Sequence, residues 1–293
     1  MGRHVLITGA AGGIGRAIAE EFAADGAVLT LADRDRVALE TVAAQLRATA
    51  PGAGSEDPVR TLTVDLTRPE AAEDLVHRAW ETSGPIDVLV NAAGVYPSLD
   101  MGEVTAADWD RLFAVNLRAP VLATGAFSRL AAERGPGGAV VNISSGSALR
   151  ARPGGGPYAS SKAALEMATR AAALELGAQG IRVNAVSPGF IPVDSACNPV
   201  SEEYAAAIGA NPLGRAGTPR DIARAVRWIA GPEASWITGE ILRVDGGSST
   251  GALHLPRIWP PERPEPAGGT PHTRTAVTVP ASPADPATEG NPA

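Results

Sequence analysis

The chain of 293 residues carries a formal net charge of −7, and 44 % of its residues are hydrophobic, enough for one large domain with a core. The acidic balance argues against nucleic acid or an anionic membrane as a partner, and no apolar run approaches the ~20 residues of a membrane helix. The only cysteine, Cys197, excludes a disulfide within the chain, so we expect a soluble protein of the reducing cytoplasm.

Seven short apolar stretches alternate with segments of helical period over the first 250 residues. Continuous apolar runs, rather than strict alternation, indicate strands that are covered on both faces, as in a parallel sheet. We therefore predict an α/β fold with a doubly wound, seven-stranded parallel sheet of the Rossmann type and helices on both faces. The expected strands are 4–8, 27–32, 59–64, 86–90, 139–143, 181–186 and 240–244.

The composition changes after about residue 250. Ten of the 25 prolines fall within residues 254–293, and that segment shows no lasting apolar period. Such a composition does not bury enough apolar surface to fold. We expect a single domain over residues 1–250 and a Pro-rich, mostly disordered tail over residues 251–293.

A glycine-rich turn, GAAGGIG, joins the first strand to the first helix. Gly9, Gly13 and Gly15 allow a sharp turn and a close approach of the backbone to a pyrophosphate, with Ile14 between them. The helix that follows presents free N–H groups and the positive end of its dipole to that anion. The strand before and the helix after favour a dinucleotide site over a glycine-rich turn without a ligand.

An acidic residue, Asp33, ends the second strand 18 residues after Gly15. A carboxylate there can accept hydrogen bonds from the adenosine ribose and repel a 2′-phosphate, which favours NAD(H) over NADP(H). Gly12, inside the glycine turn, is not a basic residue and agrees with this. Arg34 conflicts with it, because it could turn toward such a phosphate; the alternative is a solvated surface arginine.

The segment PYASSK places Tyr158 four residues before Lys162, so both project from one face of a helix. Pro157 suits the first turn of that helix. A phenol has a pKa of about 10, and a nearby ammonium lowers it toward the range of a general acid or base. The alternative, a buried tyrosine beside a lysine that reaches to solvent, stays open on this pair alone.

Two more polar features favour the chemical reading. The strand at 139–143 ends in serines, so Ser144, Ser145 or Ser147 could donate a hydrogen bond to a substrate at the edge where open α/β sheets bind ligands. Asn116 lies within an apolar helical run, where a buried amide is costly unless paired. It either bonds a neighbouring carbonyl or holds a water that relays protons.

Together, these stretches resemble the short-chain dehydrogenase/reductase family over about residues 3–250. In the family the catalytic serine lies 13 residues before the tyrosine, which selects Ser145. The matching stretches are TGAAGGIG (8–15), NAAG (91–94), Asn116, the serine strand end, YASSK (158–162), SPG (187–189) and VDGG (244–247). Singly several are weak, but their order and spacing are specific.

The resemblance implies a catalytic tetrad of Asn116, Ser145, Tyr158 and Lys162. Tyr158 would exchange the proton of the substrate oxygen, and Ser145 would orient that oxygen. Lys162 would lower the pKa of the tyrosine and bond the nicotinamide ribose, while Asn116 would support a water relay. Hydride would pass between the substrate carbon and nicotinamide C4.

The resemblance also implies a set of cofactor contacts, and the sequence departs from the family pattern at one of them. Val193 stands where the family commonly has a threonine that bonds the nicotinamide carboxamide. We expect no metal, because the four histidines, His4, His77, His254 and His272, lack ligand spacing. The expected cofactor contacts are Gly9, Gly13, Ile14, Gly15, Asp33, Asp65, Leu66, Asn91, Ala92, Gly94, Tyr158, Lys162, Pro188, Gly189 and Ile191.

The function expected from this resemblance is hydride transfer between NAD(H) and a secondary alcohol or ketone. Two alternatives are an NADPH-dependent reductase of the 3-oxoacyl type and a catalytically silent, dinucleotide-binding regulator. Arg150 and Arg152 could bind an anionic substrate, although loop arginines are more often solvated. The resemblance also implies a homotetramer or homodimer.

Overall fold

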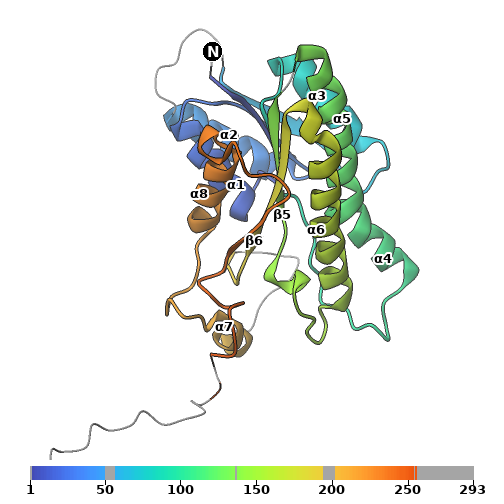
Figure 1. Cartoon of the computed structure of the whole chain (residues 1–293), viewed down its shortest axis with the longest axis vertical. Coiled ribbons are helices and arrows are strands. Elements are labelled where there is room, and N and C mark those ends of the chain that lie inside the picture. Colours follow the sequence, from blue (N-terminus) through green and yellow to red (C-terminus); the bar gives the residue numbers. More distant parts are fainter. Residues whose placement is uncertain (1, 50–56, 136, 194–201, 254, 256–293) are drawn as a thin grey trace, which may run out of the picture. The chain divides into compact units, whose positions relative to one another are not determined.

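A single parallel sheet organises the chain, whose computed structural model describes residues 2–49, 57–135, 137–193, 202–253 and 255 (Figure 1). The strand order is β3-β2-β1-β4-β5-β6-β7, so the order reverses between β1 and β4. The predicted doubly wound, seven-stranded sheet is confirmed. The strands are β1 (His4–Thr8), β2 (Val28–Asp33), β3 (Val59–Thr63), β4 (Val88–Asn91), β5 (Gly138–Ile143), β6 (Ile181–Pro188) and β7 (Ile241–Val244).

The strands are covered on both faces because successive side chains point to opposite sides of the sheet. In β1, Val5 and Ile7 belong to one apolar cluster, whereas Leu6 belongs to the other. All three side chains are fully buried. This explains why the sequence shows continuous apolar runs rather than alternation.

Helices fill the two outer layers. Helices α1 (Gly13–Ala24), α2 (Arg36–Thr49) and α8 (Pro219–Ala230) pack on the face of Val5, and α3 (Ala71–Ser83), α5 (Ala119–Arg134) and α6 (Gly156–Leu176) pack on the face of Leu6 (Figure 1). The short helix α4 (Ala106–Phe113) leads into α5 through a π-helical turn, η1 (Ala114–Arg118), and α7 spans Glu202–Gly209.

The observed strand ends differ slightly from the predicted ones, and two of the differences bear on function. Strand β2 extends to Asp33, whose backbone pairs with Thr63. Strand β6 extends to Pro188, which pairs with Val244. The polar and glycine-containing residues that follow both strands therefore start directly at the sheet edge.

The chain divides into two units, Met1–Leu253 and His254–Ala293. Apart from Leu255, the second unit lies outside the described residues. The prediction of a disordered tail over residues 251–293 therefore falls almost entirely on residues that the structure does not describe. Within the described part of the chain, no helix combines the length and apolar character needed to cross a membrane.

Candidate active site

The residues expected at the site follow the carboxyl ends of the strands. Because all the strands run parallel, these ends meet at one edge of the sheet. An open sheet of this kind forms a crevice where the strand order reverses, which here is between β1 and β4. The glycine-rich turn and the NAAG segment follow these two strands directly.

The glycine-rich turn is shaped by close backbone contacts. Gly9 has φ 70°, and a Cβ there would lie 2.7 Å from backbone atoms of Ala93. A Cβ on Gly15 would lie 2.0 Å from the carbonyl oxygen of Gly9, so only glycine permits this packing of helix on strand. Gly12 precedes α1 without a side-chain cap, and no described atom lies within 4 Å of its Cβ position. The open N-terminus of α1 therefore suits a pyrophosphate.

The start of α1 faces a residue from the other half of the sheet. Gly13, with φ 52°, would place a Cβ 3.6 Å from Cγ1 of Val193. Ile14 is half-buried and packs against the core beneath the turn. Val193 thus brings an apolar side chain, rather than a hydroxyl, toward the glycine-rich turn.

Asp33 is tied to the glycine-rich turn. Its Oδ2 accepts a hydrogen bond from the Ala11 N–H at 3.1 Å, and its Oδ1 accepts one from the Asp35 N–H at 3.1 Å. The residue is half-exposed. A carboxylate has about four lone-pair sites, so two remain for donors from a ribose.

The end of β4 is braced from below. Thr8 Oγ1 accepts hydrogen bonds from the N–H groups of Ala92 at 3.1 Å and Ala93 at 3.2 Å. Asn91 is buried and its Nδ2 donates to Oδ1 of Asn142 at 2.8 Å. The side chain of Asn91 therefore joins β4 to β5 and is not itself open to a cofactor.

Helix α6 presents Tyr158 and Lys162 on one face, and Pro157 lies in its first turn, as predicted. Lys162 Nζ lies 5.9 Å from the centroid of the Tyr158 ring and donates to the carbonyl oxygen of Ile143 at 2.7 Å. Burial lowers the pKa of Lys162 from 10.5 to about 8. A buried amine that titrates near neutrality is typical of functional sites.

The pKa of Tyr158 moves opposite to the expectation from sequence. Burial raises it above 10.0, and a hydrogen bond with Ser145 and the positive charge of Arg152 oppose this rise without overcoming it. Lys162 is not among the groups that lower it, and its Nζ donates to the sheet carbonyl instead. Desolvation, which sequence spacing does not report, decides the direction.

Among the three candidate serines, the structure brings Ser145 to Tyr158 through that hydrogen bond. Ser145 Oγ also accepts from the Ser147 N–H at 3.1 Å. Ser144 points elsewhere, donating to Oε1 of Glu166 at 2.8 Å. The geometry therefore selects the same serine as the family spacing.

Asn116 lies in the π-helical turn η1 and is fully buried. Its Oδ1 accepts from the Val95 N–H at 2.9 Å, while its Nδ2 donates to the Val95 carbonyl at 2.8 Å and to Ser161 Oγ at 3.1 Å. A Cβ on Gly94 would lie 3.5 Å from Oδ1. The amide thus locks the loop after β4 against α6, and π turns recur at functional sites.

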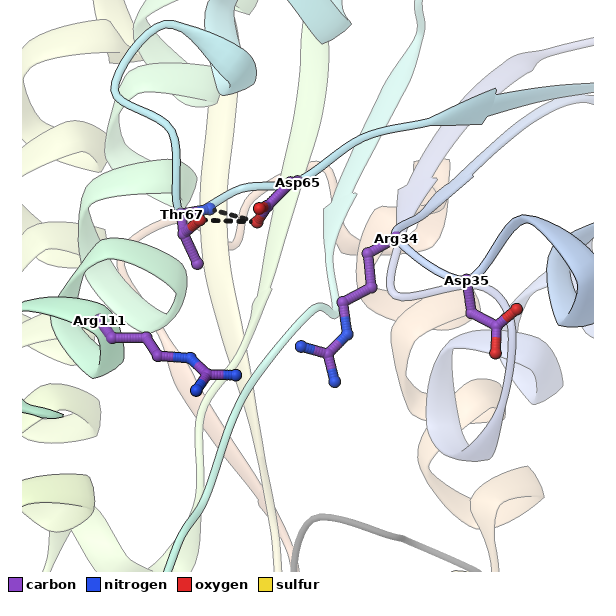
Figure 2. A pocket seen from close by; sticks show the side chains of 5 residues that line it. All are labelled: Arg34, Asp35, Asp65, Thr67 and Arg111. Carbon is purple, nitrogen blue, oxygen red and sulfur yellow. Dashed lines mark hydrogen bonds between the residues drawn. The ribbon is translucent and has the colours of Figure 1, made fainter.

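A pocket of ≈ 760 Å³, here called the arginine pocket, opens beside the end of β2. Figure 2 shows the guanidinium groups of two arginines approaching each other from opposite sides, while the Asp35 carboxylate points away from them. Asp65 accepts hydrogen bonds from Thr67 N and Oγ1 at 3.0 and 2.8 Å, which lowers its pKa. The lining residues are Arg34, Asp35, Asp65, Thr67 and Arg111.

Sequence reasoning missed Arg111 as a member of this site. It comes from α4, 46 residues beyond Asp65, and its positive charge helps to lower the pKa of that carboxyl. Leu66, predicted as a cofactor contact, has a buried side chain in the core and does not line the arginine pocket. No local pattern around Arg111 distinguishes it from a solvated helix arginine.

The end of β6 closes the edge. Gly189 donates its N–H to the Val244 carbonyl at 3.1 Å, and a Cβ there would lie 2.8 Å from Asp245. Pro188 is buried, and the Ile191 side chain packs against Gly217 and the core. The predicted contacts from Gly189 and Ile191 would therefore use backbone groups. No cluster of three or more His, Cys, Asp or Glu side chains suited to a metal occurs among the described residues.

Comparisons with known proteins agree with this geometry. A family model described as enoyl-(acyl carrier protein) reductase matches residues 9–249. Galactitol 2-dehydrogenase (L-tagatose-forming) of Cereibacter sphaeroides is 36 % identical over 250 residues, covering 84 % of this chain and 94 % of that protein. The chain belongs to the short-chain dehydrogenase/reductase family.

Other members of the short-chain dehydrogenase/reductase family extend the comparison. The 3-oxoacyl-[acyl-carrier-protein] reductase FabG of Thermotoga maritima is 32 % identical over 246 residues, covering 84 % of this chain and 97 % of that one. The solved structure of a blue fluorescent protein from a metagenomic library, in complex with NADPH, is 37 % identical with a TM-score of 0.76, covering 85 % of this chain and 98 % of that chain. As a short-chain dehydrogenase/reductase, the protein is an NAD(P)-dependent oxidoreductase of hydroxyl and keto groups.

Proposed function

We propose that the protein transfers hydride between NAD(H) and a secondary alcohol or ketone, with Tyr158 as the general acid and base. The observation that carries this proposal is the interaction of the Ser145 side chain with the Tyr158 phenol, at the sheet edge that also bears the glycine-rich turn. Two hydroxyls that share a hydrogen bond can both reach one substrate oxygen. The nicotinamide supplies or accepts the hydride when it is bound.

The side chains of the tetrad divide the remaining work. In the reductive direction the Tyr158 hydroxyl donates its proton to the substrate oxygen, and in the oxidative direction the phenolate accepts it. Ser145 fixes the position of that oxygen by hydrogen bonding. Lys162 uses one donor on the Ile143 carbonyl and has two further N–H groups for a ribose hydroxyl. Asn116 holds the loop at Val95 and the helix at Ser161 in place around them.

The choice of lysine at position 162 supports a chemical role. Lysine and arginine together number 25, and Lys162 is the only lysine in the chain. An arginine stays charged at all relevant pH values, whereas a buried lysine releases its proton readily. The one lysine therefore lies where a titratable, compact ammonium fits the proposed mechanism.

We propose NAD(H) rather than NADP(H) as the cofactor. Asp33 holds a half-exposed carboxylate at the end of β2, and its charge repels a 2′-phosphate. A specific observation favours the second candidate, an NADPH-dependent reductase: Arg34 and Arg111 point toward each other across the arginine pocket (Figure 2). Two guanidinium groups that face one pocket suit a phosphate.

Fluorescence titration with NADH and NADPH decides between these cofactors. We expect tighter binding of NADH, and Asp33→Asn should narrow the difference because it removes the repelling charge. Arg34→Gln serves as the matched change on the neighbouring residue and should weaken NADPH alone. Tighter binding of NADPH by the unaltered protein would make the arginines, rather than Asp33, the determinant.

A substrate screen tests the enzymatic assignment itself. Galactitol and 3-oxoacyl thioesters, which the names of two relatives indicate, belong in the panel beside simple secondary alcohols and steroids. Turnover with any of these supports the proposal. Binding of NADH with no turnover across the panel would instead favour the catalytically silent regulator.

We also propose a cytoplasmic homotetramer or homodimer. Support for assembly comes from apolar side chains that are exposed on α5 and α6 of a single chain: Val121 at 44 %, Met167 at 63 % and Leu174 at 86 %. Burying such a face against a second copy is favourable. Light scattering of the purified protein measures the assembly directly.

A further inference from the structure

A buried carboxylate on the catalytic helix has no part in the mechanism described above. Glu166 lies one helical turn beyond Lys162 on α6 and is 6 % exposed. A buried carboxyl is costly unless its oxygens are hydrogen-bonded. Its Oε1 accepts a hydrogen bond from Ser144 Oγ at 2.8 Å, and its Oε2 lies 4.0 Å from a half-exposed guanidinium, that of Arg170. The inward-facing oxygen is thus committed to Ser144.

The partner of Glu166 is held from a second side as well. Ser144 is 2 % exposed, and its N–H donates to the Val186 carbonyl of β6 at 2.8 Å. It immediately precedes Ser145, whose hydroxyl bonds Tyr158. Only one rigid peptide plane separates the two serines, so a change in the backbone dihedrals of Ser144 displaces Ser145.

The hydrogen bond between Glu166 and Ser144 is one of three side-chain hydrogen bonds that join α6 to the end of β5 and the residue after it. Lys162 Nζ donates to the last carbonyl of β5 at 2.7 Å, and Thr169 Oγ1 accepts from Asn142 Nδ2 at 2.9 Å. Positions 162, 166 and 169 share one face of the helix. Among the three, only Glu166 reaches past the strand to a side chain next to the reacting serine.

We propose that Glu166 is a positioning residue: its carboxylate holds the Ser144 hydroxyl and thereby keeps the Ser145 hydroxyl directed at Tyr158. The proposal rests on the proposed function of Ser145 and Tyr158. A purely structural Glu166 would affect stability alone. A positioning Glu166 also affects proton transfer, because the interaction with Ser145 is one of the two that favour the phenolate against burial.

Three variants separate these two roles. Ser144→Ala removes the donor with almost no change in volume, and Glu166→Leu removes both acceptors. Glu166→Gln keeps an amide oxygen that can accept the same hydrogen bond. Thr169→Val is the matched control, since it breaks the neighbouring contact with Asn142 on the same helix face, away from the active serine.

Steady-state kinetics and their pH dependence are measured on the full chain. Ser144→Ala and Glu166→Leu should lower kcat by about tenfold to hundredfold, the cost of a displaced catalytic group, with an unchanged KM for NADH. The alkaline limb of the kcat profile should move to higher pH, because the phenol loses a stabilising donor. Glu166→Gln should recover most of kcat, and Thr169→Val should lower the Tm without moving the profile.

A second measurement does not depend on turnover. The chain has three tyrosines, so subtracting the ultraviolet absorbance titration of Tyr158→Phe from that of the unaltered protein isolates the ionisation of Tyr158. For Ser144→Ala, the blank is the double variant Ser144→Ala/Tyr158→Phe. In this second difference titration, Tyr158 should ionise at higher pH than in the unaltered protein. If no substrate is turned over, the proposed function fails while this titration still decides the positioning role.

Two results would overturn the proposal. The first is that Ser144→Ala changes neither the kcat nor the pH at which Tyr158 ionises. The second is Thr169→Val with the same shift as Ser144→Ala, which would show a general loosening of the helix. Should Glu166→Leu fail to fold, the near-isosteric Ser144→Ala still gives either answer.

Discussion

The two ends of the proposed cofactor crevice use charge in opposite ways. In the arginine pocket, Arg34, Asp65 and Arg111 are exposed to solvent. In the tetrad, Asn116 is fully buried and Lys162 is 4 % exposed. The first set of charges is screened by water and salt, whereas burial shifts the proton affinities of the second.

This difference in exposure indicates which property the arginine pocket and the tetrad can each control. Exposed charges interact weakly, typically by 0–1 kcal/mol per pair, so the arginine pocket can tune a preference between cofactors. Burial at the other end lowers the pKa of Lys162 from 10.5 to about 8 and raises that of Tyr158. The proposed proton transfer would therefore be controlled at the buried end.

The largest effect should come from the buried end. Tyr158→Phe removes the only proton donor that the mechanism assigns to the substrate oxygen, so kcat should fall by roughly 10²- to 10⁴-fold. NADH binding, measured by fluorescence, should stay unchanged. Tyr96→Phe is the comparison, since it keeps the edge-on ring contact with Tyr158 at 6.2 Å and should cost far less. A Tyr158→Phe variant with normal turnover would remove the tyrosine from the mechanism.

The next effect concerns the only lysine. Its folded pKa of about 8 lies below its ordinary 10.5, so between these values the unfolded chain binds more protons than the folded one. Stability from this residue is therefore complete above pH 10.5 and is lost as pH falls to 8, by up to about 3 kcal/mol. Urea unfolding of the unaltered protein and of Lys162→Met, compared at pH 7.5 and 10, isolates this difference.

Isotopic labelling measures the same pKa without unfolding. Because Lys162 is the only lysine, lysine labelled with ¹³C at Cε gives one side-chain signal in the whole protein. We expect its titration midpoint near 8. A midpoint near 10.5 would mean that the ammonium is solvated and that the contrast between the two ends is wrong.

The same contrast explains what the sequence could predict. Strands and the glycine turn were accessible because their signals are local: apolar runs of strand length, and the steric need for glycine at Gly9 and Gly15. The pairing of Tyr158 with Lys162 followed from helical spacing. Signals along the chain were therefore enough to predict the fold, and the order of the motifs was enough to propose the tetrad.

Properties that depend on tertiary environment were not accessible. The direction of the Tyr158 pKa depends on desolvation, so the expected lowering by Lys162 was wrong. Glu166 looks like a surface residue of a helix until the structure buries it against Ser144. Arg111 lines the same pocket as Asp65 only because the fold places α4 beside it. In each case burial or the approach of another element, rather than sequence spacing, decides the environment of the residue.

A smaller effect should come from the loop between Ser145 and Tyr158. The positive charge of Arg152 favours the phenolate of Tyr158, so Arg152→Gln should raise the pKa of Tyr158 further. We expect the alkaline limb of the kcat profile to move to higher pH by a fraction of a unit. Arg150→Gln is the matched control, because Arg150 donates to the Ser248 carbonyl at 3.1 Å instead. Equal shifts in both variants would assign the effect to net charge.

The smallest effect belongs to the arginine pocket. Arg111→Gln and Arg34→Gln should each weaken NADPH binding by about fivefold or less at low salt, the range of exposed ion pairs. Raising the salt to 0.5 M should shrink this difference, because screening shortens the reach of exposed charges, and should leave the Tyr158→Phe effect unchanged. Fluorescence titration of NADPH and NADH at both salt concentrations measures it. If the loss persisted at high salt, the two guanidinium groups would hold the phosphate in a desolvated site, and the proposed contrast between an exposed and a buried end would fail at its exposed end.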